Sequence, residues 1–74
     1  MKIIKMKAKD IKVGERFRRK LGNIELLAQL IKEEGLLYPI LVDKDGNLID
    51  GYRRLVALIQ LGIEEMEVLI DEAA

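Results

Sequence analysis

The residues best suited to chemistry stand together between Asp50 and Arg54, in the run Asp-Gly-Tyr-Arg-Arg. A short apolar segment precedes this run, and an apolar stretch at helical spacing follows it. Gly51 has no Cβ, so the backbone there can turn sharply and another molecule can come close. The first N–H groups of a helix lack partners inside it, and the helix dipole favours an anion beside them. With Arg53 and Arg54 in the first turn, the junction predicts a phosphate cradle.

A structural interpretation of the same residues stays open. Asp50 can cap the helix, Gly51 can form a tight turn, and the two arginines can be solvated side chains that pair with nearby acids. The run is neither a Walker loop nor a GxGxxG fingerprint. Taken alone, the local sequence favours this structural interpretation.

The composition limits the chemistry that any site here can use. The chain has 74 residues, half of them hydrophobic, and contains neither cysteine nor histidine. Thiol chemistry, disulfides and histidine-based catalysis are therefore excluded, and carboxylates, arginine, lysine and tyrosine remain. No apolar run approaches the roughly 20 residues of a membrane span and no signal peptide is visible, so we expect a cytoplasmic protein with no membrane partner. Abundant lysine and glutamate favour a heat-adapted, thermophile source.

The charges are divided unevenly along a chain whose net charge is zero. Residues 1–20 hold nine Lys or Arg and two acidic residues, a net +7, and the remainder holds four and eleven, a net −7. Such asymmetry can be a footprint for nucleic acid or a phosphorylated ligand, can join unlike ends of two copies, or can serve solubility alone. From the basic segment we expect at most weak, sequence-independent DNA binding.

Hydrophobic periodicity and turn residues predict the elements that must position the Asp50–Arg54 run. Asn23 is expected to begin the first helix, Gly35 to end it in a left-handed conformation, and Asp45-Gly46 to form a hairpin turn. Helices are predicted over residues 24–34 and 52–61, and strands over residues 2–8, 40–44, 48–49 and 66–70. The order β-α-β-β-α-β predicts an α+β fold, a small mixed sheet with packed helices, in one domain over residues 1–74.

The second predicted helix has more apolar surface than one packing face requires. Ala57 and Leu61 fall on its outer side, so we expect a homodimer or higher oligomer with these two residues at or near the contact. The alternative is a monomer in which the first helix or the N-terminal arm covers them. The expected core face of the second helix comprises Tyr52, Leu55, Val56, Leu58 and Ile59. The first helix is expected to bury Ile24, Leu27, Ala28, Leu30 and Ile31.

Three segments carry a resemblance to the ParB/sulfiredoxin family: I-K-E-E-G-L-L-Y-P-I-L-V over residues 31–42, L-I-D-G-Y-R-R-L-V-A over residues 48–57, and the L-G pair at 61–62. The chain is most similar to the N-terminal domain of ParB-type partition proteins, whose G-x-R-R segment binds a nucleoside triphosphate. The resemblance implies a nucleotide such as CTP, ATP or ADP, with Mg²⁺ beside Asp50. It implies phosphate contacts from Gly51, Tyr52, Arg53 and Arg54, with Arg16 or Arg18 nearby.

Departures from the family pattern keep other functions open. Tyr52 stands where the family usually has Glu, and the second phosphate motif and the DNA-reading helix-turn-helix of ParB proteins have no counterpart. Sulfiredoxins use a cysteine in this loop, so that activity is not expected. The loop is also similar to the D-G-x-x-R loop of ADP-dependent free serine kinases, which implies nucleotide hydrolysis or phosphoryl transfer with Asp50 and Glu15 as candidate catalytic carboxylates. The last alternative is a structural or dimerising module without a ligand.

Overall fold

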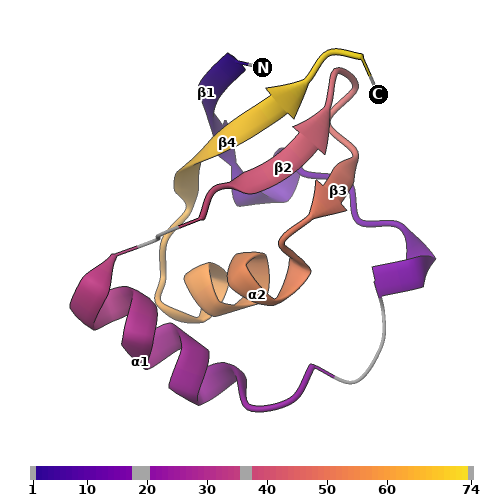
Figure 1. The fold of residues 1–74 in the computed structure, drawn as a ribbon. Coiled ribbons are helices and arrows are strands. Elements are labelled where there is room, and N and C mark those ends of the chain that lie inside the picture. The colour runs from indigo at the N-terminus through magenta and orange to yellow at the C-terminus, as the bar shows by residue number, and fades with distance from the viewer. Residues whose placement is uncertain (1, 18–20, 36–37, 74) are drawn as a thin grey trace.

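Figure 1 shows the fold of the computed structural model, which describes residues 2–17, 21–35 and 38–73. Every helix and strand predicted from the sequence is present, and each end lies within one residue of the predicted end. The elements are β1 (Lys2–Lys7), η1 (Ala8–Asp10), η2 (Glu15–Phe17), α1 (Ile24–Glu34), β2 (Ile40–Asp43), β3 (Leu48–Asp50), α2 (Tyr52–Gln60) and β4 (Glu65–Asp71). The predicted α+β fold is therefore confirmed.

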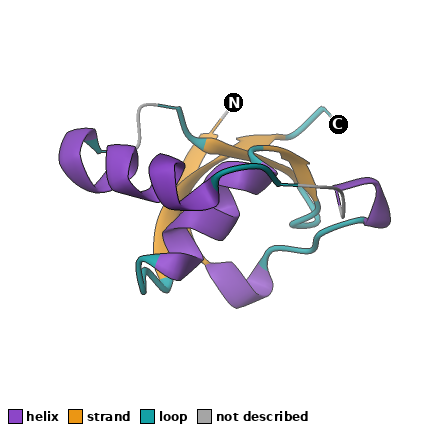
Figure 2. Ribbon diagram, turned by 90° about the horizontal axis from the view of Figure 1, so that it is seen from below, coloured by secondary structure: helices purple, strands orange, loops and turns teal. Residues whose placement is uncertain are grey.

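The four strands form one mixed sheet in the order β1-β4-β2-β3. β1 pairs with β4, and β2 with β3, in antiparallel orientation, whereas β2 and β4 run parallel. The parallel pair requires a crossover, which the chain makes through β3 and α2. α1 packs mainly on α2, and Figure 2 shows the two helices next to each other beside the sheet.

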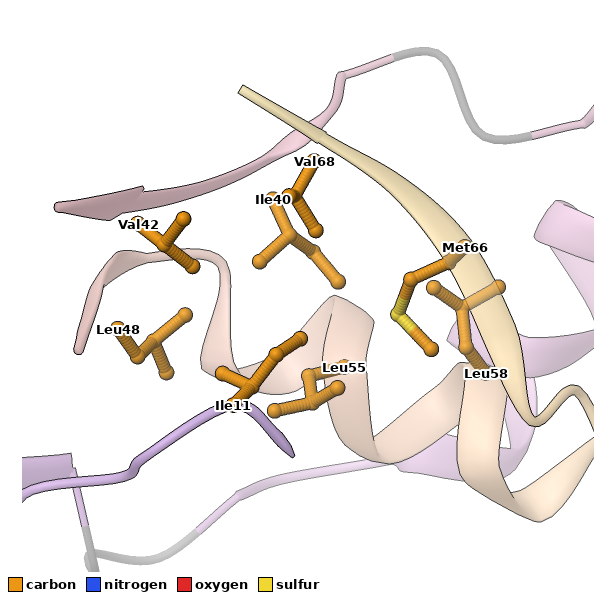
Figure 3. Packing of buried hydrophobic residues seen from close by; sticks show 8 residues of the cluster. All are labelled: Ile11, Ile40, Val42, Leu48, Leu55, Leu58, Met66 and Val68. Carbon is orange, nitrogen blue, oxygen red and sulfur yellow. The ribbon is translucent and has the colours of Figure 1, made fainter. Parts of the chain in front are cut away.

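The main hydrophobic core lies between α2 and the inner face of the sheet. Ile40, Val42 and Val68 are completely buried, as expected for alternate residues of central strands. Ile11 joins them from the turn after β1. The Lys12 N–H then donates a 2.9 Å hydrogen bond to the Gly46 carbonyl of the hairpin. Figure 3 shows eight side chains of this core, Ile11, Ile40, Val42, Leu48, Leu55, Leu58, Met66 and Val68.

A second, smaller cluster joins the two helices and corrects a prediction. Ala57 is fully buried against Ile24 and Ala28 of α1, and Leu61 is half-buried beside them. The expectation that Ala57 lies at a contact between copies of the chain is wrong, because α1 covers that side of α2. The first helix covers Ala57, as the alternative interpretation expected, and the oligomeric state itself stays a prediction.

Two further side chains differ from their predicted burial, and one helix end differs in geometry. Leu30 of α1 is 44% exposed and Ile59 of α2 is 51% exposed, although both were predicted in the core. Gly35 ends α1 with a positive φ of 83°, but its ψ of 174° is extended and not left-handed helical. The predicted cap at the other end is confirmed, since Asn23 Oδ1 accepts a hydrogen bond of 3.0 Å from the Leu26 N–H. None of the helices described is long and apolar enough to cross a membrane.

Some of the basic residues of the N-terminal segment lie opposite acidic residues in the sheet. In the antiparallel register of β1 and β4, Lys5 lies opposite Glu67 and Lys7 lies opposite Glu65. Opposite charges at directly paired positions stabilise a sheet. The basic beginning and the acidic end of the chain therefore meet within one molecule.

Candidate functional site

A cleft of about 450 Å³ opens between the N-terminus of α2 and the C-terminal half of α1. One of its walls is apolar and aromatic, formed by Phe17, Leu27, Leu30, Ile31, Tyr38 and Tyr52. Polar and charged groups gather at the start of α2, where Asp50, Gly51, Arg53 and Arg54 line the cleft. Glu34 and Gly35 complete the rim at the end of α1. The cleft thus offers an apolar surface beside a positively charged helix end.

Gly51 is the N-cap of α2 and adopts a left-handed conformation, with φ 104° and ψ 26°. A Cβ at this position would lie 3.3 Å from the Cα of Ile40 and 3.2 Å from Nη2 of Arg54, so only glycine fits without movement. Because the cap is a glycine, it has no side chain to accept bonds from the N–H groups of the first turn. The structural interpretation in which Asp50 caps the helix is therefore wrong.

Arg54 lies folded back over Gly51. Its Nη2 is 3.4 Å from Oδ2 of Asp50, and its guanidinium carbon is 5.9 Å from the centre of the Tyr38 ring. Its Nε is fully buried and, within the part of the chain that the structure describes, has no hydrogen-bond partner. The ion pair between Arg54 and Asp50 is long, and the Asp50 side chain is 75% exposed, so this pair stabilises the guanidinium only weakly.

Arg53, the other arginine of the loop, is held differently. Its Nε donates a hydrogen bond of 2.9 Å to the carbonyl oxygen of Leu21, in the segment that leads into α1. The side chain is exposed and lies at the rim of the cleft. The sequence placed both arginines in one phosphate clamp, but only Arg54 lies over Gly51.

Of the three candidates from the segment before α1, Arg16 and Glu15 do not line the cleft, although Arg16 packs on Phe17, which does. Arg16 stacks on the Phe17 ring at 4.5 Å, and its Nη2 donates a 3.3 Å bond to the Ile49 carbonyl at the edge of β3. Glu15 is exposed at the start of η2 and does not line the cleft. Arg18 lies outside the described residues. Among the residues that the structure describes, the candidates that line the cleft are therefore those between Asp50 and Arg54.

Tyr52 serves both the core and the cleft. It is half-buried against the main core, and its ring centre lies 5.9 Å from that of Phe17. Phe17 and Tyr38 were not identified as cleft residues from the sequence. The sequence signal for Tyr38 is its place directly before Pro39. In the structure the Tyr38 side chain is 68% exposed, so it does not belong to the core.

Residues 2–74 match the family model of the ParB N-terminal domain. The chain belongs to the ParB N-terminal domain family. It is 40% identical over 52 residues to a probable plasmid-partitioning protein ParB of Thermus thermophilus, covering 66% of this chain and 18% of that protein. It is 34% identical over 65 residues, 82% of this chain, to an uncharacterized protein of Acidianus two-tailed virus, of which it covers 20%. The chain thus spans about a fifth of the length of these relatives.

Solved structures agree with this assignment. The ParB-N domain of a pNOB8-like protein has a TM-score of 0.78 and 25% identity, covering 93% of this chain and 29% of that one. A C-terminally truncated ParB of Caulobacter crescentus complexed with CTP-γ-S has a TM-score of 0.80 and 21% identity, covering 97% and 45%. Sulfiredoxin of Arabidopsis thaliana has a TM-score of 0.81 and 22% identity, covering 97% and 86%. The last two show a shared fold, and the predicted resemblance to both branches is confirmed.

Proposed function

We propose that this ParB-like, partition-related module binds a nucleotide in the cleft, with the phosphates beside Gly51 and the N-terminus of α2. The observation that carries the proposal is the guanidinium of Arg54, which lies over Gly51 and whose polar contact among the described residues is the 3.4 Å pair with Asp50. A guanidinium has five donors, and a partly desolvated one is most stable when an anion accepts from several of them. The backbone N–H groups of the first turn of α2 add donors at the same place.

The rest of the cleft fits the other half of a nucleotide. Leu27, Leu30 and Tyr38 give an apolar and aromatic surface against which a base or sugar can pack. The ParB of Caulobacter crescentus, which shares this fold, is described as complexed with CTP-γ-S. CTP is accordingly the first ligand to test, with ATP and ADP as the other candidates.

Magnesium belongs to the proposal through the phosphates. Mg²⁺ in nucleotide sites commonly uses one or two carboxylates together with phosphate oxygens and water. Asp50 is the carboxylate next to Gly51, whereas Glu34 approaches the cleft from α1. Among the residues that the structure describes, no group of three or more candidate metal ligands exists. Asp50 would therefore act with the phosphates and not as part of a protein cage.

Isothermal titration of the protein with CTP, ATP and ADP, each with and without Mg²⁺, tests the proposal. We expect saturable binding of at least one nucleotide, displaced by inorganic triphosphate because both ligands use the same anion contacts. The unphosphorylated nucleoside should bind more weakly, since it lacks those contacts. If no nucleotide gives a saturable heat of binding, the alternative of a structural module without a ligand is favoured.

Partition function would also involve DNA and a second copy of the chain. We include in the proposal weak binding of DNA without sequence preference, through lysines of the N-terminal segment, with a strong dependence on salt. Lys5 and Lys7 already face glutamates of β4, which reduces the charge they offer to phosphates. A homodimer is also part of the proposal, but Ala57 does not contribute to it because α1 buries that residue.

A further inference from the structure

We infer that Arg53 is a positioning residue that sets the place of α1 at the cleft, and that it is not a second phosphate clamp. Its Nε lies 2.9 Å from the Leu21 carbonyl oxygen, a distance typical of a well-formed N–H···O bond. The contact between Arg54 and Asp50 is 3.4 Å. The Nε of Arg53 is therefore bonded to protein backbone, whereas the Nε of Arg54 has no hydrogen-bond partner among the described residues. The part of this inference that concerns ligand affinity rests on the proposed nucleotide site.

The bond joins two elements that are 32 positions apart in the sequence. Leu21 is half-buried against the cluster of Ile24, Ala28 and Ala57, so its backbone is already close to α2. The Ile24 N–H then bonds the Gly22 carbonyl at 3.1 Å, and Asn23 caps the helix. The first turn of α2 is thus fastened to the start of α1.

Gly22 lies beside this contact. It has a positive φ of 74°, and a Cβ built there would lie 3.8 Å from Nη2 of Arg53. The guanidinium therefore lies against the backbone of residues 21–22, with its Nε on the carbonyl. The Nε of Arg53 is therefore bonded at the start of α1, whereas the guanidinium of Arg54 lies over Gly51.

The position of α1 matters to the cleft because α1 supplies its apolar wall. Leu27, Leu30 and Ile31 line the cleft one to two turns beyond the start of the helix. α1 packs mainly on α2, and the buried contact between them includes two alanines, Ala28 and Ala57. A shift at the start of α1 would therefore carry the wall toward or away from Arg54. Arg53 fixes this spacing, while Arg54 contacts the anion.

The test compares the wild-type protein with Arg53→Gln, Arg53→Lys and Arg54→Gln in two measurements. The first is amide hydrogen exchange of Leu26 and Leu27, whose N–H groups bond Asn23 in the first turn of α1. We expect both Arg53 variants to raise these exchange rates about three- to tenfold, the range of one net hydrogen bond. Arg54→Gln should leave them unchanged. Lysine should not rescue, because it keeps the charge but has no Nε–H at the bonding position.

The second measurement is titration with CTP and with inorganic triphosphate. Arg54→Gln should weaken both ligands by a similar factor, whereas Arg53→Gln should weaken CTP more than inorganic triphosphate, which does not need the apolar wall. Equal weakening of both ligands by Arg53→Gln, with rescue by Arg53→Lys, would show a clamp and overturn the inference. Unchanged exchange in both Arg53 variants would overturn it as well. If neither ligand binds wild-type protein, the proposed function fails, while the exchange comparison still decides whether Arg53 positions α1.

Discussion

The two turns at the ends of β3 have similar sequences and opposite hydrogen-bonding character. The hairpin before β3 runs from Asp43 to Asn47, and the junction after it contains Asp50 and Gly51. The Asp43 carboxylate accepts the backbone N–H groups of Asp45 and Asn47, each at 2.9 Å, and the Asn47 side-chain amide at 3.1 Å. The Asp50 carboxylate is 75% exposed and has one 3.4 Å contact, to Arg54.

This difference separates a turn that stabilises the fold from a turn that is ready for a ligand. An acid beside a glycine is a common turn signal, and by itself it does not show which kind of turn forms. In the hairpin both oxygens of the Asp43 carboxylate accept hydrogen bonds from groups of the same turn. At the junction, the helix N-terminus and the neighbouring guanidinium keep donors available. Substitutions at matched positions in the two turns should therefore affect different properties of the protein.

The glycines of the two turns provide the largest expected difference. Gly51→Ala introduces a Cβ 3.3 Å from the Ile40 backbone in a left-handed conformation, so both steric crowding and backbone strain act. We expect a loss of about 2–4 kcal/mol in the free energy of unfolding. Gly46→Ala, with φ 84° and its nearest neighbours at 3.5 Å, should lose only the strain, about 1–2 kcal/mol. Urea denaturation measures both, and equal losses would contradict the tight approach at Gly51.

Arg54→Ala should separate binding from stability. Removing a charge-assisted contact to phosphate should weaken CTP binding by about 1.5–3 kcal/mol. The unfolding free energy should change by about 1 kcal/mol or less, because the pair with Asp50 is weak and the buried Nε has no hydrogen-bond partner among the described residues.

Lys32→Ala is the matched control for this charge change. Lys32 is an exposed residue of α1 that does not line the cleft, so its loss should leave the affinity for CTP unchanged. Equal weakening by Lys32→Ala and Arg54→Ala in titration calorimetry would indicate a general charge effect and not a contact at Gly51.

The sequence was sufficient to predict the elements and the Asp50–Arg54 junction. Helix and strand ends follow from local chemistry, such as the Asn23 cap and the Asp45-Gly46 turn, so their prediction needs no tertiary information. The close approach at Gly51 was also predictable, because glycine at a strand–helix junction allows it.

Which side chains are buried was predicted less well, because burial depends on how the two helices pack on each other. α1 lies on α2, so α2 has two packing sides, and Ala57 is buried on the second of them. The same arrangement turns Leu30 toward the cleft and leaves it partly exposed. The sequence could not show that Arg53 bonds the Leu21 carbonyl, because helix packing is what brings that acceptor near.

Asp43→Asn should weaken the fold in a way that depends on pH. Hydrogen bonds from the Asn47 backbone, and then from the Asn47 side chain and the Asp45 backbone, lower the pKa of the Asp43 carboxyl below its usual 3.8. The unfolded chain therefore takes up this proton more readily than the folded one. The carboxylate contributes its full stabilisation above the unfolded-state pKa, and the contribution is lost as the pH falls through the folded-state pKa.

Urea denaturation of wild type and Asp43→Asn at neutral pH and at successive pH values below 3.8 measures this dependence. The variant should be less stable at neutral pH, and the difference should shrink on acidification. Asn47→Ala, which removes the side-chain donor but keeps the backbone N–H, should show a smaller version of the same effect. A difference that persists unchanged in acid would mean that the Asp43 charge does not stabilise the hairpin.

Asp50→Asn, the matched change at the other turn, should have the smallest effect on folding and a measurable effect on binding. Its ion pair is exposed, so the free energy of unfolding should change by about 0.5 kcal/mol or less. Without Mg²⁺ the variant should bind CTP about two- to fivefold more tightly, since a like charge a few ångströms from the phosphates has been removed. With Mg²⁺ this gain should disappear, because the carboxylate that would help to hold the ion is also lost. Titration of both proteins with and without Mg²⁺ measures the four affinities, and the same Mg²⁺ dependence in both would place Asp50 away from the phosphates and the metal.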